Sequence, residues 1–381
     1  MENKKNNITL DPNMEAAEPS SAIVFQPAAP DVEAFNATTN KKEQGLMHEG
    51  DDKKKESTPT LIGDASLLEA PIDTPINICS KDGDNADGLL VLCPKPSRFK
   101  GYVITRQGGR LENQDSFIIG KTRLGYLLVV CDGMGGGPGG KTASQMACNI
   151  IFNTVNTSPL KLPANIKKSE NSILNFALEF ANYNIKQYAQ EHPSLKGMGT
   201  TCALVLITRN KAFVKHVGDS RVYQLRGMRK VYRTTDHSYV FELLKQHALK
   251  TEEQARLSTQ ANIITSALGI SREIPHIESQ ELAYKKGDRF LITTDGIHGT
   301  MPEKRLLEDV CLPVKDGKEE EGLRHIMRQL ADKVDSIGIG KGNKYDNLTG
   351  VLIEMATDSA LNAPLIQNVK DKIIKMKNLF Q

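Results

Sequence analysis

Four aspartates have the residue type and the sequence setting for metal chemistry. Asp132, Asp219, Asp295 and Asp346 each stand at the edge of an apolar run, three beside a glycine and the fourth before Asn347. A buried strand holds its last side chain in a fixed place, and glycine lets a backbone approach a bound group closely. A single aspartate in this setting is usually a turn residue, but four of them favour a common site.

If the four strands lie in neighbouring sheets, these carboxylates can converge. Like charges a few ångströms apart raise one another's pKa unless a cation is present. Hard oxygen ligands select Mg²⁺ or Mn²⁺, and two such ions about 3.5–4 Å apart can hold a hydroxide and clamp a phosphoryl group. Cys131, His216 and His298 lie near the aspartates in sequence but lack the paired spacing of zinc ligands, so a zinc site is not expected.

Two loops lie next to the aspartates in the chain. Arg110 lies in a glycine-flanked loop shortly before Asp115, where a guanidinium can form a fork onto a phosphate, although an exposed loop arginine more often has no such role. The loop after Asp132 offers a rival interpretation, because GGGPGG at 135–140 contains the GxGxxG pattern of dinucleotide-binding sites. Asp132 would then face the pyrophosphate, and no second strand with an acidic end follows promptly. The metal interpretation is therefore favoured.

The elements that must position these side chains are a mixture of strands and amphipathic helices. Apolar runs predict strands at 88–93, 99–105, 116–120, 126–131, 199–208, 212–217, 221–225, 288–294 and 348–355. Helical spacing predicts helices at 141–156, 173–188, 239–248, 251–257 and 323–334, with a flexible loop at 338–342. Two long helices after a sheet segment do not fit regular βαβ alternation.

Charge is distributed unevenly along the 381 residues. The net charge is +3, but residues 1–95 hold 9 Lys against 17 Asp and Glu, a net −8 that leaves +11 for the remainder. With only two aromatic residues, that segment cannot bury enough apolar surface to offset the entropy of ordering. We therefore expect a disordered acidic tail at 1–95, followed by a domain at 96–357. A basic domain can favour phosphorylated substrates, although a solvated basic surface is an equally good explanation.

The cysteines and the termini bear on location and partners. The six cysteines form no CxxC pair and several lie in apolar runs, which is typical of buried thiols in a reducing compartment. The N-terminus lacks the apolar region of a secretory signal, and no apolar run approaches the ~20 residues of a membrane span. The last segment, 358–381, predicts a basic amphipathic helix whose stripe within 364–381 can pack on its own domain, on a membrane or in a partner groove.

Seven motifs together resemble the metal-dependent protein serine/threonine phosphatases of the 2C type, in particular their bacterial branch. In chain order these motifs are RLENQDSF (110–117), VVCDGMGG (129–136), GTTCALVLI (199–207), HVGDSRVYQL (216–225), TTDHS (234–238), LITTDGI (291–297) and DNLTGVLI (346–353). They span about 99–356, the whole predicted domain. Each motif alone is weak, and seven in the right order are specific.

The resemblance implies an α+β fold, a four-layer α-β-β-α sandwich of two antiparallel sheets flanked by helix pairs. It also implies two Mn²⁺ or Mg²⁺ ions, leaves a third ion open, and has a bridging hydroxide attack the phosphorus of phosphoserine or phosphothreonine in a protein. By position, the metal ligands would be Asp132, Gly133, Asp219, Asp295 and Asp346. Arg110 would bind the phosphate, Asp115 would bind metal-held water, and 236–280 would be a flap beside the site.

We expect a monomer in the bacterial cytosol, with delivery into a host cell left open. No nucleic-acid partner is expected. A catalytically silent module of the same fold and a phosphatase for small molecules are the alternatives, and the retained aspartates and Arg110 argue against the silent module.

Several residues depart from the family pattern. Gln114 and Lys141 each stand where many members have Glu, and Gly137-Pro138 replaces a frequent His-Ala pair. Met134 takes the place of a histidine that acts as general acid in many eukaryotic members, so water or another group must protonate the leaving group. None of these changes removes an expected metal ligand, and we therefore expect an active enzyme.

Overall fold

A computed structural model describes most of the chain beyond residue 98. It gives the backbone alone of 78–79, 87–91 and 319–320, and the backbone and side chains of 99–135, 139–157, 162, 166–270, 275–315, 318 and 321–359. The expected helix within 358–381 and nearly all of the expected tail at 1–95 lie outside the described residues. Two short strands, β1 and β2, fall within the segment expected to be tail.

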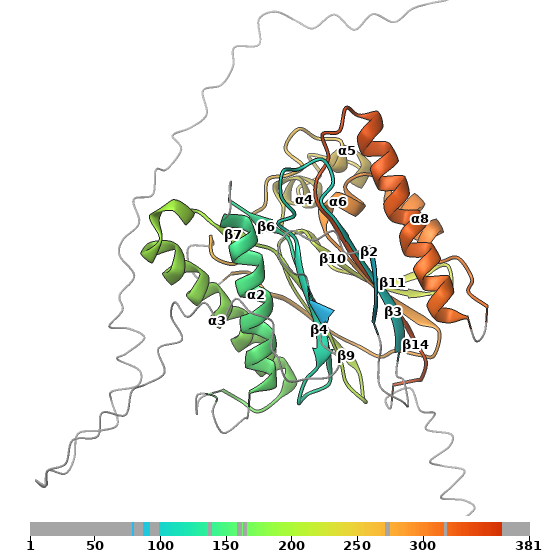
Figure 1. Ribbon diagram of the computed structural model, residues 1–381, viewed down its shortest axis with the longest axis horizontal. Coiled ribbons are helices and arrows are strands. Elements are labelled where there is room, and N and C mark those ends of the chain that lie inside the picture. Colours follow the sequence, from blue (N-terminus) through green and yellow to red (C-terminus); the bar gives the residue numbers. More distant parts are fainter. Residues whose placement is uncertain are drawn as a thin grey trace, which may run out of the picture. The chain divides into compact units, whose positions relative to one another are not determined.

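Two six-stranded antiparallel sheets form the centre of the described chain (Figure 1). The first has the order β1 (Ile78–Cys79), β4 (Ser116–Lys121), β5 (Tyr126–Cys131), β8 (Cys202–Ile207), β9 (Ala212–Val217) and β12 (Glu278–Leu282). The second has the order β11 (Arg229–Arg233), β10 (Arg221–Arg226), β13 (Asp288–Thr293), β14 (Leu348–Met355), β3 (Phe99–Arg106) and β2 (Asp87–Val91). A small pair, β6 (Gly133–Met134) and β7 (Gly199–Thr200), lies beside the first sheet's end.

Helices cover the outer face of each sheet, as Figure 1 shows for α2, α3 and α8. The first sheet packs against α2 (Gly139–Asn156) and α3 (Glu170–Glu191), and the second against α7 (Glu303–Val310) and α8 (Glu319–Gly340). The other helices within the described part of the chain are short: η2 (Pro193–Leu195), α4 (Tyr239–Lys245), α5 (Glu252–Arg256) and α6 (Asp295–His298). The predicted four-layer α-β-β-α sandwich is confirmed.

The strands β5 and β8 are apolar along their whole length because both of their faces are buried. In β5, Leu127 and Val129 pack against α2 and α3, whereas Leu128 and Val130 pack between the two sheets. The same alternation holds in β8, and in β3 one face meets the other sheet while the opposite face meets α8. Since side chains alternate across a strand, a run without polar residues predicts a strand with a core on each side.

Most predicted elements are found, with ends that differ by a few residues. The predicted flexible loop at 338–342 is wrong for its first part, because α8 continues to Gly340. Gly338 sits against the Tyr345 ring, where a β-carbon would lie 2.3 Å from the ring carbons. The glycine therefore serves close packing inside a helix, which overrides its low helix propensity.

The structure tests two expectations from the sequence, that cysteines are buried thiols and that the chain contains no membrane span. Cys131, Cys148, Cys202 and Cys311 are buried free thiols, as predicted for the first three. Among the helices of the described residues, none combines the length and the apolar character needed to cross a membrane.

Candidate active site

Asp132 follows β5 directly, and two threonines fix its backbone. Its N–H donates to Thr201 Oγ1 (3.0 Å), and its carbonyl accepts from Thr201 N–H (2.9 Å) and from the Thr200 hydroxyl (2.8 Å). Thr201 Oγ1 also lies 2.7 Å from Ser220 Oγ, beside Asp219. Thr201 therefore links the loop that carries Asp132 to the loop that carries Asp219.

Asp295 and Asp346 come from paired strands of the second sheet. Asp295 directly follows Thr294 after β13, and Asp346 lies two residues before β14. Reciprocal hydrogen bonds of 3.0 Å join Thr294 and Thr349, from Thr294 N–H to Thr349 O and from Thr349 N–H to Thr294 Oγ1. The antiparallel ladder thus brings the two aspartates to the same end of the sandwich.

Asn347 holds the arginine loop against this end of the second sheet. Its side-chain amide donates to the carbonyls of Gln107 (2.6 Å) and Glu112 (2.9 Å), and its Oδ1 accepts from Gln114 N–H (2.9 Å). The loop between Gln107 and Gln114 is thereby tied at three points to the residue that follows Asp346. Such a small, almost fully buried asparagine satisfies loop backbone groups that no strand reaches.

Arg110 lies at the tip of this loop with 56% of its side chain exposed. One Nη2 donates to Asp346 Oδ2 at 2.5 Å. The rest of the guanidinium lies at the mouth of a cavity, since Arg110 is one of its lining residues. Arg110 is therefore both beside a site carboxylate and accessible to a ligand.

Asp115 is buried beneath the site. Its Oδ2 accepts from the Thr294 hydroxyl (3.0 Å), and its N–H donates to Asn113 Oδ1 (3.1 Å). Lys141, which departs from the family pattern, is 7% exposed and donates from Nζ to the Asp115 carbonyl (2.9 Å). The lysine thus lies next to the site and supports the Asp115 backbone.

The five aspartates lie close enough together to shift one another's pKa. Removal from water raises the pKa of Asp132 well above its ordinary value, and the charges of Asp115, Asp295, Asp346 and Asp219 raise it further. Burial is also the main cause that raises the pKa of Asp115 to about 7 and that of Asp295 to about 6, with Asp346 adding to both. The predicted carboxylates therefore lie close enough to repel one another.

The donor set suits hard divalent cations. Asp115 Oδ1, Asp219 Oδ1 and Asp295 Oδ1 are buried oxygens without a hydrogen-bond partner among the described residues. A cluster of acidic oxygens with raised pKa values and unused lone pairs is stable only when protonated or when it binds cations. Oxygen ligands without thiolate or imidazole favour Mg²⁺ or Mn²⁺. The residues present fit such a site.

Gly133, the predicted carbonyl ligand, lies in a tight backbone crossing. A β-carbon at this position would be 2.1 Å from the Gly140 carbonyl oxygen and 2.7 Å from the Gln114 carbonyl oxygen. No side chain fits there, so this glycine lets the start of α2 approach Asp132. Gly137 and Pro138, which also depart from the family pattern, lie outside the described residues.

A cavity of about 840 Å³ opens above the aspartates. Asp219, Asp295 and Asp346 form part of its lining, and the segment of α4 and α5 forms another part through Phe241, Arg256 and their neighbours. The predicted flap therefore borders the site. A cavity of this size can enclose a phosphorylated side chain together with some of its flanking residues.

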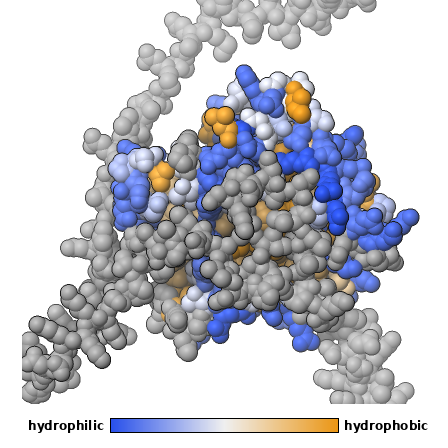
Figure 2. Space-filling view, viewed as in Figure 1, coloured by the Kyte–Doolittle hydropathy of each residue, from blue (hydrophilic) through white to orange (hydrophobic). Residues whose placement is uncertain are grey.

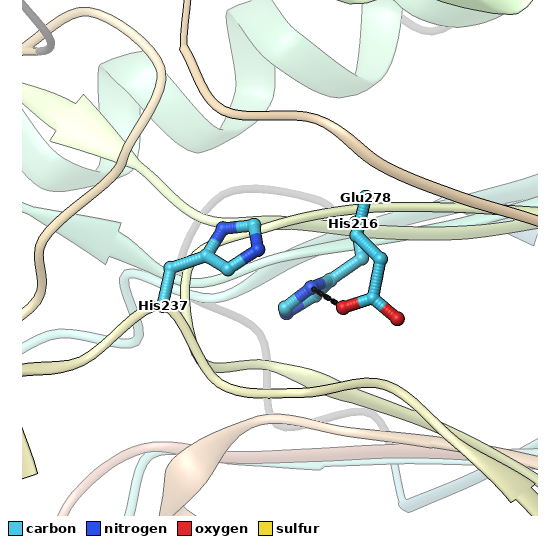
Figure 3. A group of neighbouring side chains, drawn as sticks. All are labelled: His216, His237 and Glu278. Atoms are coloured by element: carbon cyan, nitrogen blue, oxygen red, sulfur yellow. Dashed lines mark ion pairs between the residues drawn. The ribbon is translucent and has the colours of Figure 1, made fainter. Parts of the chain in front are cut away.

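Sequence reasoning did not find two groups of residues that shape the site. Thr201 and Asn347 occur inside the recognised motifs, but their hydrogen bonds reach across the fold and have no signature in spacing. His216, His237 and Glu278 gather behind the Asp219 loop, with potential ligand atoms within 4.8 Å of one another (Figure 3). Because these three residues are far apart in the chain, only the fold brings them together.

The chain is similar to known proteins in sequence and in structure. The chain matches a family model described as Protein phosphatase 2C over residues 106–334. It is 29% identical over 250 residues to the serine/threonine phosphatase stp of Listeria welshimeri, covering 65% of this chain and 88% of that protein.

Two solved structures are also similar. The serine/threonine phosphatase Stp1 from Staphylococcus aureus superposes with a TM-score of 0.56 at 26% identity, covering 68% of this chain and 95% of that one. The catalytic domain of the serine/threonine protein phosphatase PstP, in complex with two manganese ions, gives a TM-score of 0.52 at 26% identity and covers 68% of this chain and 98% of that one.

Proposed function

Because the chain belongs to the protein phosphatase 2C family and is a serine/threonine protein phosphatase, we propose that it hydrolyses phosphoserine and phosphothreonine with two bound Mn²⁺ or Mg²⁺ ions. Asp132, Gly133, Asp295 and Asp346 would hold the two ions, and Asp219 with Asp295 would hold a third. When bound, the ions supply a hydroxide nucleophile at neutral pH and neutralise charge on the phosphoryl oxygens. The two manganese ions in the PstP structure support this choice of metal.

The convergence of the aspartates supports this proposal most strongly. Five carboxylates from five separate segments share one end of the sandwich, and three of their buried oxygens have no partner among the described residues. An uncompensated cluster of this kind costs folding free energy and persists where function requires it. A purely structural explanation would instead pair each carboxylate with a cation, as Arg221 pairs with Asp236 beside the site.

The chain's own residues would position the substrate and a water molecule. The exposed guanidinium of Arg110 would bind two phosphate oxygens, because it presents a planar fork of N–H donors. Asp115 would accept a hydrogen bond from water through its unpartnered Oδ1 while Thr294 holds its other oxygen. Met134 cannot donate a proton, so water would protonate the serine or threonine leaving group.

The test is turnover by the full-length protein. We expect hydrolysis of p-nitrophenyl phosphate and of a phosphothreonine peptide in Mn²⁺ or Mg²⁺, and none in EDTA. Asp132→Asn should lower kcat by at least about a thousandfold, since it removes a ligand that both ions would share. The control is Asp332→Asn, an exposed aspartate paired with Arg106, which should leave turnover unchanged.

Folding of the variants would be checked by circular dichroism. Turnover by wild type in EDTA, or full activity of a folded Asp132→Asn protein, would contradict the proposed metal centre. A protein that hydrolyses sugar phosphates but no phosphopeptide would contradict the proposed protein substrate.

We also propose the finer organisation that the sequence suggests. Residues 96–357 would form the catalytic domain and act as a monomer in the bacterial cytosol, for which the buried free cysteines are suitable. The segments 1–95 and 358–381 would be appendages, the second able to make weak contact with a membrane or a partner. Size-exclusion chromatography with light scattering tests the monomer, and limited proteolysis tests the boundaries.

A further inference from the structure

His216, His237 and the partly buried Glu278 form a cluster (Figure 3), and His237 is hydrogen-bonded to Gly218, the residue before Asp219. His216 in β9 lies opposite Glu278 in β12, and His237 follows β11. His216 and His237 are 0% and 6% exposed, and three of their four ring nitrogens have no hydrogen-bond partner among the described residues. Such a group invites comparison with a two-histidine, one-carboxylate metal site.

The hydrogen bonds argue against a metal here. Gly218 N–H donates to His237 Nδ1 at 3.2 Å, so that nitrogen is unprotonated. Burial, and after it the neighbouring His216 and His276, lowers the pKa of His237 to about 3, so the ring is neutral and carries its proton on Nε2. Both Glu278 oxygens already accept hydrogen bonds, from the Tyr232 hydroxyl (2.9 Å) and Thr235 N–H (3.0 Å). A protonated Nε2 cannot bind a metal ion.

The unprotonated Nδ1 of His237 instead accepts a hydrogen bond from the backbone of Gly218. His237 N–H donates to the Gly218 carbonyl at 2.7 Å, while Gly218 N–H donates to the His237 ring. One histidine therefore satisfies both backbone groups of the residue that immediately precedes Asp219. This matters because Gly218 has φ +104°, a conformation that other residues rarely adopt, and a β-carbon there would lie 2.7 Å from Thr201 Cγ2.

His237 stands at the start of the predicted flap, 236–280, and is also hydrogen-bonded to a later part of it. The His237 carbonyl accepts from Thr265 N–H at 2.8 Å, and the next residue, Ser238, forms a bridge with Ile264. Its preceding neighbour, Asp236, makes a two-point ion pair with Arg221 at 2.8 and 2.7 Å. His237 is therefore hydrogen-bonded both to Thr265, in the later part of the flap, and to Gly218, in the turn before Asp219.

We infer that His237 is a positioning residue, which fixes Asp219 for cation binding and couples its position to the flap. This inference rests on the proposed function, in which Asp219 is a ligand of the third ion. The imidazole acts through Gly218 and does not touch the substrate or the ions. Loss of the ring acceptor would leave a buried N–H unsatisfied, and the turn would relax in a way that moves the Asp219 carboxylate.

Two substitutions separate the ring acceptor from simple packing. His237→Asn places an amide oxygen close to the position of Nδ1, so it can still accept from Gly218 N–H. His237→Gln places its amide oxygen further out, near the position of Nε2, where Gly218 is out of reach. His276→Gln is the matched control, because the centroid of the His276 ring lies 4.6 Å from that of His237, but His276 is exposed and Gly218 makes its hydrogen bonds to His237.

The experiment measures Mn²⁺ binding by electron paramagnetic resonance of free Mn²⁺, together with kcat and the Mn²⁺ concentration for half-maximal activity. We expect His237→Gln to weaken the weakest Mn²⁺ site by about tenfold, the cost of one unsatisfied buried N–H. His237→Asn should recover most of that loss, and His276→Gln should match wild type. Equal behaviour of the Asn and Gln variants, whether both impaired or both normal, would overturn the inference.

A second measurement needs neither activity nor metal. Long-range ¹H–¹⁵N spectra of the imidazole in the metal-free wild type should show His237 with its proton on Nε2 and with Nδ1 unprotonated. A proton on Nδ1 would overturn the inference even if the Gln variant failed to fold. Absence of metal-dependent turnover in wild type would instead overturn the proposed function, whatever the histidine variants do.

Discussion

Arg110 and Asp346 illustrate how single side chains divide the work at the residue scale. Their 2.5 Å ion pair lies at the rim, where exposure weakens its contribution to stability. The pair instead helps to set the direction of the guanidinium, because Nη2 donates to Asp346 and Arg110 is one of the residues that line the cavity. Arginine is suited to this because its fork is planar and rigid, whereas lysine presents a single rotating ammonium.

We therefore predict that Arg110→Lys impairs substrate binding more than metal binding. Loss of the fork onto phosphate should lower kcat/KM by about 10- to 100-fold, the worth of one or two charge-assisted hydrogen bonds. The inhibition constant for inorganic phosphate should rise in parallel, while the Mn²⁺ requirement stays near that of wild type because the positive charge is kept. An unchanged phosphate inhibition constant would remove Arg110 from phosphate binding.

At this scale the sequence predicted the charged residues of the site. It did not predict the residues whose hydrogen bonds fix the loops that carry those charges. Asp132, Asp219 and Asp295 could be found because each follows or interrupts an apolar run beside a glycine. Thr201 and Asn347 could not, since their value lies in hydrogen bonds to segments up to 240 residues away in the chain. A polar side chain that satisfies a distant backbone group leaves no periodic pattern in a sequence.

At the scale of elements, the buried strands could be predicted, whereas the edge strands could not. Strands buried on both faces are rich in apolar residues, and β5 and β8 stand out because they are continuous apolar runs. The strands β11 and β12 are largely polar because they lie at sheet edges, and both escaped prediction. The short helices α4 and α5 were found with ends too late by one to three residues, since their length depends on tertiary contacts.

The segment that joins β11 to α4 carries a prediction for the pH dependence of stability. His237 is neutral in the fold, with its pKa lowered to about 3 by burial and by His216 and His276, so the stability it contributes is present above the unfolded pKa of about 6.5. As the pH falls from 7.5 to 5.5, the unfolded chain takes up a proton that the folded chain does not. The free energy of unfolding should therefore fall by about 1.4 kcal/mol on account of this residue.

Chemical denaturation of metal-free wild type and His237→Asn at both pH values measures this contribution. The comparison is necessary because Asp115 and Asp295, with pKa values raised to about 7 and 6, act in the opposite direction and cancel between the two proteins. Of the other groups near His237, Glu278 has its pKa lowered to about 2 and does not titrate in this range. Equal pH dependence in the two proteins would mean that His237 is accessible to protons in the fold.

At the scale of the whole molecule, the described fold has three apolar cores, and the aspartates lie together at one end of the sandwich. One layer lies between the first sheet and α2 and α3, one between the sheets, and one between the second sheet and α7 and α8. On the face of the molecule that Figure 2 draws, most of the coloured residues are hydrophilic and few are hydrophobic. The cores can offset the repulsion of the carboxylate cluster, so the molecule is folded with a locally unfavourable site, as is usual where function sets the residues.

This balance predicts that metal reverses the stability order of wild type and Asp132→Asn. In EDTA at pH 8 the wild type must fold with several ionised carboxylates near one another, whereas the asparagine lacks the charge that four neighbours oppose. Asp132→Asn should therefore melt about 2–6 °C higher, which corresponds to about 1–2 kcal/mol for a domain of this size. Saturating Mn²⁺ should raise the melting temperature of the wild type above that of the variant, since ligand at 100 times its Kd adds about 2.7 kcal/mol to the stability of the native state.

Differential scanning calorimetry with and without Mn²⁺ measures both stability orders, with Asp332→Asn as a control that should follow wild type throughout. A wild type that is the more stable protein in EDTA would mean that the aspartates do not repel one another, and the electrostatic basis of the site would be lost.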